Sequence, residues 1–252
     1  MKLTIHHLYA DMMNLYGDRG NVIAIKKRAE WRGLPVEVVD VGLGESIKPT
    51  FSADLFLFGG GQDREQALVA PDLAGKPGLS EAVERGAAVL AVCGGYQLLG
   101  RFYRERSGAE LPGVGLFPLH TVAGTRRMIG DVLLECELDP GLRRTLAGFE
   151  NHAGRTILDA GAEPLGRVVA GFGNDGESGF EGCRVGRALG TYLHGPLLPR
   201  NPWLADWLLA AALAHRTGAA DAPELEPLPD VLEQEAHAVS SARARGRGGR
   251  FP

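Results

Sequence analysis

Cys93 is the residue of this 252-residue chain that best fits a catalytic nucleophile. It follows the apolar run Ala88–Val92 and precedes Gly94 and Gly95, after which the sequence takes on helical character. A cysteine on such a strand-to-helix turn directs its sulfur out of the sheet, at a helix N-terminus where backbone N–H groups favour the thiolate. The pattern predicts a nucleophile elbow with cysteine in place of serine. Alone, such a cysteine is more often a small buried apolar side chain, so the prediction depends on a partner.

His194 is the partner that the sequence offers. It follows the strand-like residues 190–193 and precedes Gly195 and Pro196, so it lies where a predicted strand ends. The carboxyl ends of strands in a parallel sheet form the ligand crevice, which would bring Cys93 and His194 to one edge. A histidine there can take the thiol proton and later protonate a leaving group. The alternative is a loop histidine bound by the backbone, and the elbow at Cys93 favours the functional interpretation.

Three consecutive glycines at residues 59–61 follow the apolar run Leu55–Phe58. Backbone N–H groups exposed after a strand can hold an anion, and a phosphate loop is one such site. The sequence contains neither the phosphate-loop motif nor a correctly spaced dinucleotide-binding motif, so half of an oxyanion hole is the better interpretation. The expected donors are an amide near Gly60 and the amide of Gly94, the residue after the nucleophile.

Six segments of the chain resemble class I glutamine amidotransferases of the cobyric-acid-synthase-like branch. More narrowly, they resemble the glutaminase subunits (GatD type) of lipid II isoglutaminyl synthases. The segments follow the family order over most of residues 1–216, and they are residues 14–21 (NLYGDRGN), 59–67 (GGGQDREQA), 93–97 (CGGYQ), 127–131 (RMIGD), 148–156 (GFENHAGRT) and 190–196 (GTYLHGP). The elbow alone is moderately specific, and the segments at 148–156 and 190–196 together favour the narrower resemblance.

The resemblance implies a glutaminase in which Cys93 is the nucleophile and His194 its base. Arg127 matches the arginine that holds the substrate glutamine; without the resemblance, it would be interpreted as half of a solvated surface pair. Amidotransferases of the wider class carry a glutamate two residues after the histidine, where it orients the imidazole. This chain has Pro196 there, a loss that the branch shares, so the site resembles a dyad. Glu150 and a backbone carbonyl are the candidates for orienting His194.

The same resemblance implies a division of labour, because the chain has no ATP-binding loop. A Mur-ligase-like partner (MurT type) would form a heterodimer with this chain and bind ATP and Mg²⁺. It would activate the D-glutamate carboxyl of the lipid II stem peptide and convert it to D-isoglutamine with the ammonia released here. This chain itself is expected to hold no cofactor and no metal.

Three alternatives stay open on the sequence alone. The chain could be the glutaminase component of another cobyric-acid-synthase-like amidotransferase. It could also be a cysteine-elbow hydrolase of the same fold, such as a deglycase or a peptidase-like enzyme, which would leave Arg127 unexplained. A non-catalytic scaffold with a vestigial site is disfavoured because Cys93, His194 and the glycine loops are intact.

Composition limits the class of protein further. Hydrophobic residues make up 44% and charged residues 23%, and the net charge of -4 gives no general attraction to nucleic acid or anionic lipid. The three cysteines, Cys93, Cys136 and Cys183, are too few and too scattered for a disulfide framework and form no C-x-x-C pair. The N-terminus lacks a signal-peptide core, and no stretch is long enough to span a membrane. We therefore expect a cytoplasmic protein without membrane insertion.

The elements that must position these residues are those of an open, mostly parallel α/β sheet with helices on both faces. Its strands lack polar alternation, which fits burial on both sides, and the resemblance implies the flavodoxin-like amidotransferase architecture. The expected strands are residues 3–8, 36–39, 55–58, 87–92, 131–138, 167–170 and 188–193, and the expected helices are residues 20–32, 80–86 with a Ser80 cap, and one that starts at Asn201 and Pro202.

We expect one amidotransferase domain over residues 1–218 and a C-terminal extension over residues 219–252. The extension begins with proline-rich acidic residues, and we expect a short helix after them at residues 229–237. From Ser241 on, arginine and glycine predominate, a composition typical of a flexible tail.

Overall fold

The computed structural model of the chain describes residues 2–47 and 53–246. Its first sheet has the strand order β11-β12-β4-β3-β1-β2, and every neighbouring pair is parallel except β11 with β12. The strands are β1 (Leu3–Leu8), β2 (Val36–Val41), β3 (Leu55–Phe58), β4 (Ala88–Val92), β11 (Cys183–Val185) and β12 (Ala188–Thr191). The expected mostly parallel sheet is confirmed.

The centre of this sheet forms because its strands are apolar on both faces. Every residue of β3, β4 and β12 is buried, since helices cover the sheet from either side. The register aligns Phe58 with Ala91 and Thr191 with Val92, so the three strands end at the same edge. The segments that follow them therefore begin side by side, although they lie far apart in the sequence.

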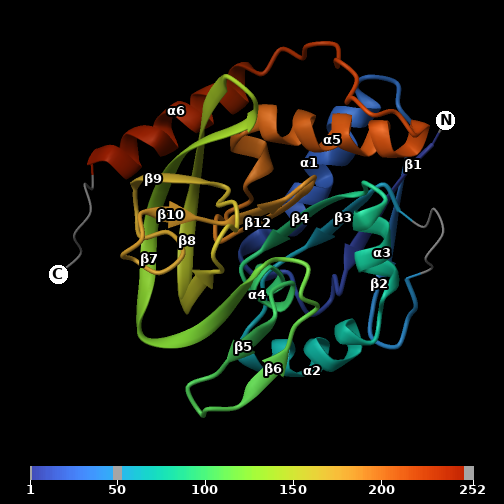
Figure 1. The fold of residues 1–252 in the computed structure, drawn as a ribbon. Helices are drawn as coiled ribbons and strands as arrows, with labels where there is room; N and C mark the ends of the chain where they lie inside the picture. The colour runs from blue at the N-terminus through green and yellow to red at the C-terminus, as the bar shows by residue number, and fades with distance from the viewer. Residues whose placement is uncertain (1, 48–52, 247–252) are drawn as a thin grey trace.

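Helices lie on both faces of the sheet, with α1 and α5 on one side and α2, α3 and α4 on the other (Figure 1). Their bounds are α1 (Arg19–Glu30), α2 (Asp63–Ala74), α3 (Gly78–Glu84), α4 (Gly94–Leu98) and α5 (Pro202–Thr217), with short 3-10 turns η1 (Leu15–Gly17) and η2 (Leu198–Arg200). Helix α5 begins at the predicted pair, with Asn201 as N-cap and Pro202 at the first helical position. None of the helices in the described ranges is both long and apolar enough to cross a membrane.

Two helix predictions need correction. Helix α3 begins after Pro77, two residues earlier than expected, so Ser80 lies inside the helix rather than at its cap. Helix α2 was not predicted, because its segment was interpreted as part of the glycine loop. A proline inside it, Pro71, further weakens its helical pattern.

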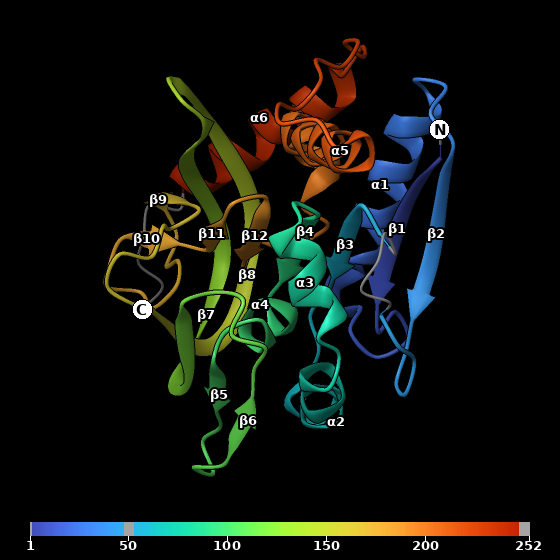
Figure 2. The ribbon, with the colours of Figure 1, turned by 45° about the vertical axis from the view of Figure 1, so that its right-hand side comes forward.

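A second sheet packs beside the first, and a long antiparallel hairpin of β7 and β8 dominates it (Figure 2). Its strands are β5 (Phe102–Arg104), β6 (Glu110–Pro112), β7 (Leu119–Asp139), β8 (Leu142–Leu158), β9 (Gly166–Ala170) and β10 (Phe180–Glu181). The sequence predicted only the second half of β7 and most of β9, and β8 was missed. A two-way backbone bridge between Phe149 of β8 and His194 connects this sheet to the end of β12.

The C-terminal extension is ordered through a long final helix. Gly218 ends α5 with a left-handed backbone (φ 67°), and residues 219–230 cross back over α1. Helix α6 (Val231–Gly246) then lies along the β7–β8 hairpin (Figures 1 and 2). The expected helix at 229–237 is therefore longer, and Ser241 is helical and buried rather than part of a flexible tail. Residues 247–252 lie outside the described ranges.

Candidate active site

Cys93 occupies a strained turn between β4 and α4. Its backbone has φ 51° and ψ −106°, and Tyr9 is the other non-glycine residue with positive φ in the described ranges. The Cys93 N–H donates to the Thr191 carbonyl at 2.8 Å, which fixes the turn against the end of β12. The elbow expected from the sequence is present. A Cβ on Gly95 would lie 2.7 Å from the Phe58 ring, so glycine is required for this close approach.

The other two cysteines lie in the core. Burial raises the pKa of Cys136 and of Cys183 to about 12. Both thiols therefore stay protonated at neutral pH and are poor nucleophiles. Cys93 is the cysteine that lines a pocket.

His194 lies beside Cys93, with its side chain fully buried. Its Nδ1 lies 3.5 Å from Oδ1 of Asp18, whose side chain is only 2% exposed. Burial lowers the pKa of His194, but Cys93 and Asp18 together outweigh that effect and raise it to about 10. The protonated imidazolium form of His194 is therefore favoured beside the Cys93 side chain.

Gly60 is the point on which these groups converge. A Cβ built there would lie 3.0 Å from His194 Cε1, 3.3 Å from Cys93 Cβ and 3.5 Å from Asp18 Oδ2. The Gly60 N–H donates to Asp18 Oδ2 at 2.8 Å, so this amide is not directed at a reacting carbonyl as we expected. The next amide, Gly61 N, lies 2.9 Å from where a Cβ would stand on Gly94. The backbone nitrogen of Gly61 therefore lies close to Gly94 at the elbow.

Asp18 is the site residue that the sequence did not single out. Glu150 was a candidate for orienting His194, but its carboxylate binds other groups. The Glu150 carboxylate accepts the N–H groups of Phe172 (2.6 Å) and Gly173 (3.0 Å) and lies 3.7 Å from His152. The signal for Asp18 was its position in the segment 14–21, which carries part of the family resemblance but gives no role to this carboxylate.

A pocket of about 680 Å³ opens in front of Cys93. Arg127 of β7 lines it, and the Arg127 guanidinium is held by Asn151, whose side-chain oxygen accepts from Nε at 2.9 Å and whose carbonyl accepts from Nη2 at 3.1 Å. No ion pair of the described residues joins Arg127 to a carboxylate. The further lining residues include Leu15, Gly61, Gln62, Asp63, Arg64, Gln66, Gln97, Tyr103 and Arg106.

His152, which lines this pocket, belongs to a stacked pair of rings. His152 lies parallel to Tyr192, with centroids 3.5 Å apart and an interplanar angle of 2°. Burial lowers the pKa of His152, which keeps the ring neutral, and its Nδ1 contacts the Gly154 carbonyl. The Tyr192 hydroxyl accepts a hydrogen bond from Gln97 Nε2 at 3.0 Å, which connects the ring pair to α4. His152 is therefore a structural histidine of the pocket, not the partner of Cys93.

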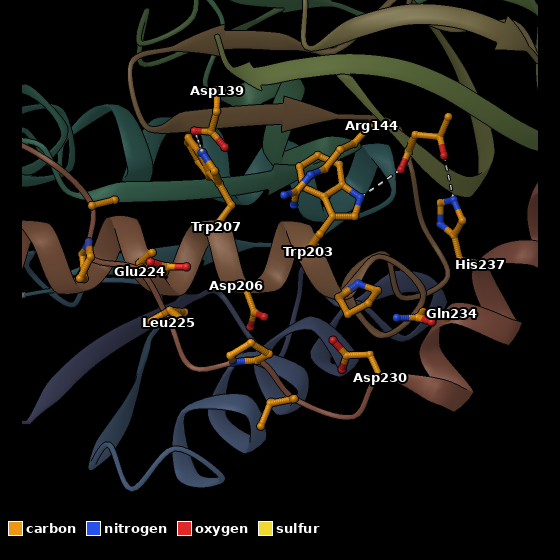
Figure 3. A pocket seen from close by; sticks show the side chains of 17 residues that line it. Asp139, Arg144, Trp203, Asp206, Trp207, Glu224, Leu225, Asp230, Gln234 and His237 are labelled. Carbon is orange, nitrogen blue, oxygen red and sulfur yellow. Dashed lines mark hydrogen bonds between the residues drawn. The ribbon is translucent and has the colours of Figure 1, made fainter. Parts of the chain in front are cut away.

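A larger pocket, of about 870 Å³, lies elsewhere, between α5 and the C-terminal extension (Figure 3). Two of its polar groups already have partners within the chain. Trp203 Nε1 donates to the Thr145 carbonyl at 3.1 Å, and Trp207 Nε1 donates to Asp139 at 3.0 Å. The pocket is a seam where the extension packs against the domain, and Cys93 and His194 do not line it.

The sequence profile of the CobB/CobQ-like glutamine amidotransferase domain matches residues 4–202. The chain belongs to this family. Its membership makes the chain a glutamine-hydrolysing amidotransferase, and it confirms the resemblance stated above.

Relatives within the family match most of the chain. The GatD subunit of lipid II isoglutaminyl synthase (glutamine-hydrolyzing) from Staphylococcus aureus is 45% identical over 217 residues, 85% of this chain and 86% of that protein. The GatD subunit from Streptococcus pneumoniae is 41% identical over 236 residues, 93% of this chain and 88% of that protein. Cobyric acid synthase from a Synechococcus species is 38% identical over 136 residues, 50% of this chain but 25% of that protein.

Among solved structures, PurLQS from Thermotoga maritima has the same fold. One of its chains aligns with a TM-score of 0.54 at 15% sequence identity, and the alignment covers 86% of the present chain and 99% of the PurLQS chain. At that identity the similarity concerns the fold alone.

Proposed function

We propose that this chain is the glutaminase subunit of a lipid II isoglutaminyl synthase. The observation that carries the chemistry is the convergence of Cys93 and His194 on Gly60, beside a pocket that Arg127 also lines. Two GatD subunits that match this chain over most of both lengths support the narrower assignment. The cobyric acid synthase relative matches only half of the chain, which makes that alternative the weaker one.

The reaction begins when glutamine enters the pocket and Arg127 binds its α-carboxylate. The Cys93 thiolate attacks the side-chain carboxamide carbon, and the amides of Gly61 and Gly94 hold the oxyanion. His194 protonates the departing nitrogen, so ammonia leaves and a γ-glutamyl thioester stays on Cys93. His194 then takes a proton from water, which cleaves the thioester to glutamate and restores the thiol. One glutamine and one water thus give glutamate and ammonia without a cofactor.

The second half of the proposal is a partner that uses the ammonia. Both matched relatives are named as subunits, and a Mur-ligase-like chain (MurT type) would complete a heterodimer with this one. That chain would bind ATP and Mg²⁺ and activate the D-glutamate carboxyl of lipid II. We place the reaction in the cytoplasm, which suits the three unpaired cysteines.

The test uses the complex co-purified from the native cell, with lipid II, ATP and either glutamine or a high concentration of ammonium. Cys93→Ala should abolish amidation from glutamine and leave amidation from ammonium, because only ammonia production is lost. Cys183→Ser is the matched control and should support both reactions. Glutamine-dependent amidation by Cys93→Ala would overturn the proposed nucleophile. Amidation by the purified wild-type chain alone would show that no partner is needed.

A further inference from the structure

The imidazole of His194 has a buried carboxylate beside it that comes from a distant segment of the chain. We propose that Asp18 is the positioning residue of this site, holding the His194 ring and the Gly60 loop with its two carboxylate oxygens. This inference rests on the proposed glutaminase function and deepens it, because it concerns how the base of that reaction is oriented.

One carboxylate oxygen of Asp18 lies against the Gly60 loop, and the other lies against the His194 ring. Oδ2 accepts the Gly60 N–H at 2.8 Å, a normal hydrogen bond that fixes the loop facing Cys93. Oδ1 lies 3.5 Å from His194 Nδ1. That separation is longer than a good N–H···O hydrogen bond but within ion-pair range, so Oδ1 acts on His194 mainly through charge. With Nδ1 turned to Asp18, Nε2 is the nitrogen that serves the thiol.

The fold brings Asp18 to this place through a contact with Pro196. A Cβ on Gly20 would lie 2.4 Å from Pro196 Cγ, so the start of α1 packs directly on the turn that follows His194. Proline offers no side-chain acceptor, and the carboxylate of Asp18, the residue just before α1, lies beside the ring instead. Asn21 holds the same turn from α1, because its side-chain oxygen accepts the Leu198 N–H at 2.9 Å.

The charged groups around the pair leave this role to Asp18. Cys93 acts on His194 from the elbow, and His7 of β1 lines the same small cavity as Asp18. Burial lowers the pKa of His7, which keeps that ring neutral, so it brings no competing cation. The Glu150 carboxylate is held by two backbone amides.

The direct test is a histidine ¹⁵N NMR titration of the full chain carrying Cys93→Ala, with and without Asp18→Asn. The first change removes the Cys93 sulfur, so Asp18 is left to oppose the effect of burial on the His194 ring. We expect the His194 pKa to stay above its ordinary value in Cys93→Ala and to fall by about one unit or more when Asp18→Asn is added. A His194 pKa already at or below the ordinary value in Cys93→Ala alone would overturn the proposal, even if Asp18→Asn does not fold.

The kinetic test compares Asp18→Asn with the matched control Asn21→Ala, which loses a buried hydrogen bond of the same segment without touching His194. Asparagine still offers an oxygen to the Gly60 N–H, but it removes the charge. Asp18→Asn should lower kcat for glutamine hydrolysis by about 10- to 1,000-fold, change KM by less than about twofold, and move the alkaline limb of the pH profile to lower pH. Asn21→Ala should leave that limb in place.

The outcomes separate the two proposals. A wild-type chain that hydrolyses no glutamine in its complex would overturn the proposed function, whatever the NMR titration gives. Two results would reject Asp18 as the positioning residue while the wild-type chain still hydrolyses glutamine. One is an Asp18→Asn variant whose activity and alkaline pH limb match those of the wild-type chain. The other is an Asn21→Ala variant whose alkaline limb moves as far as that of Asp18→Asn.

Discussion

Arg127 differs from the other site residues because its side chain is exposed and held by Asn151. Two hydrogen bonds to Asn151 orient the guanidinium plane, and a planar fork binds a carboxylate through two parallel hydrogen bonds. A lysine would keep the charge but lose that geometry.

We therefore predict that Arg127→Lys raises KM for glutamine by about tenfold or more and changes kcat much less, since the α-carboxylate is bound equally before and during reaction. Steady-state glutaminase kinetics measure this, with Arg126→Lys as the neighbouring control. An unchanged KM in Arg127→Ala would assign Arg127 to the solvated surface.

Gly60 leaves little room for a side chain. Because a Cβ would approach both His194 and Cys93 within about 3.3 Å, Gly60→Ala should push the base and the nucleophile apart. We predict a loss of kcat of about 100-fold, the cost of a small misplacement in a catalytic pair. Gly42→Ala is the matched control, because the nearest atom to its Cβ is 4.0 Å away. Wild-type kcat in Gly60→Ala would show that the site is looser than its geometry indicates.

At the scale of elements, the end of β12 is held by a buried glutamate from β10. Glu181 accepts the Tyr192 N–H at 2.6 Å and the Thr191 hydroxyl. Burial raises its pKa to about 8, so the folded chain keeps this carboxyl protonated at pH values where the unfolded chain has lost the proton. The folded state therefore binds more protons between about pH 4.5 and pH 8, and Glu181 makes stability fall as pH rises through that window.

Glu181→Gln should flatten this dependence, because glutamine keeps an oxygen acceptor and cannot ionise. Urea unfolding at pH 5, 6.5 and 8 would measure it, and the expected result is a smaller decrease in the free energy of unfolding than in the wild-type chain. Glu163→Gln, at an exposed site, is the control. An equal decrease in both variants would contradict the prediction.

The sequence predicts some strands of this fold accurately and misses others. Strands β1, β3 and β4 were predicted nearly to the residue, because continuous burial produces apolar runs that polar segments interrupt clearly. The sequence does not predict strand β8, because its buried face carries the polar residues Glu150, His152 and Thr156. Glu150 and Thr156 are hydrogen-bonded to distant residues that no local pattern reveals. Asp18 was missed for the same reason, since its bond to Gly60 spans 42 residues.

At the scale of the whole molecule, a cluster of charges joins the extension to the domain. Arg28 of α1 is buried and pairs with Asp206 of α5 and with Asp230, the residue just before α6. Arg32 adds a second pair to Asp206. Removing one carboxylate leaves a buried guanidinium underpaired, which costs more than losing a surface ion pair.

Asp230→Ala should therefore lower the free energy of unfolding by about 1–3 kcal/mol and leave kcat within about twofold, since the cluster does not line the pocket at Cys93. Urea denaturation and glutaminase assays measure the two quantities. The control is Glu226→Ala, whose backbone carbonyl, not its side chain, binds Arg32. A change in stability no larger than in the control would mean that the extension is held elsewhere.

The backbone conformation of Cys93 lowers the stability of the fold. A side chain at φ 51° and ψ −106° costs on the order of 1–3 kcal/mol, and glycine alone adopts this conformation freely. Cys93→Gly should consequently melt at a higher temperature than Cys93→Ala, although both are inactive. The fold therefore carries this strain at its nucleophile, where a glycine would be more stable but could not attack the substrate.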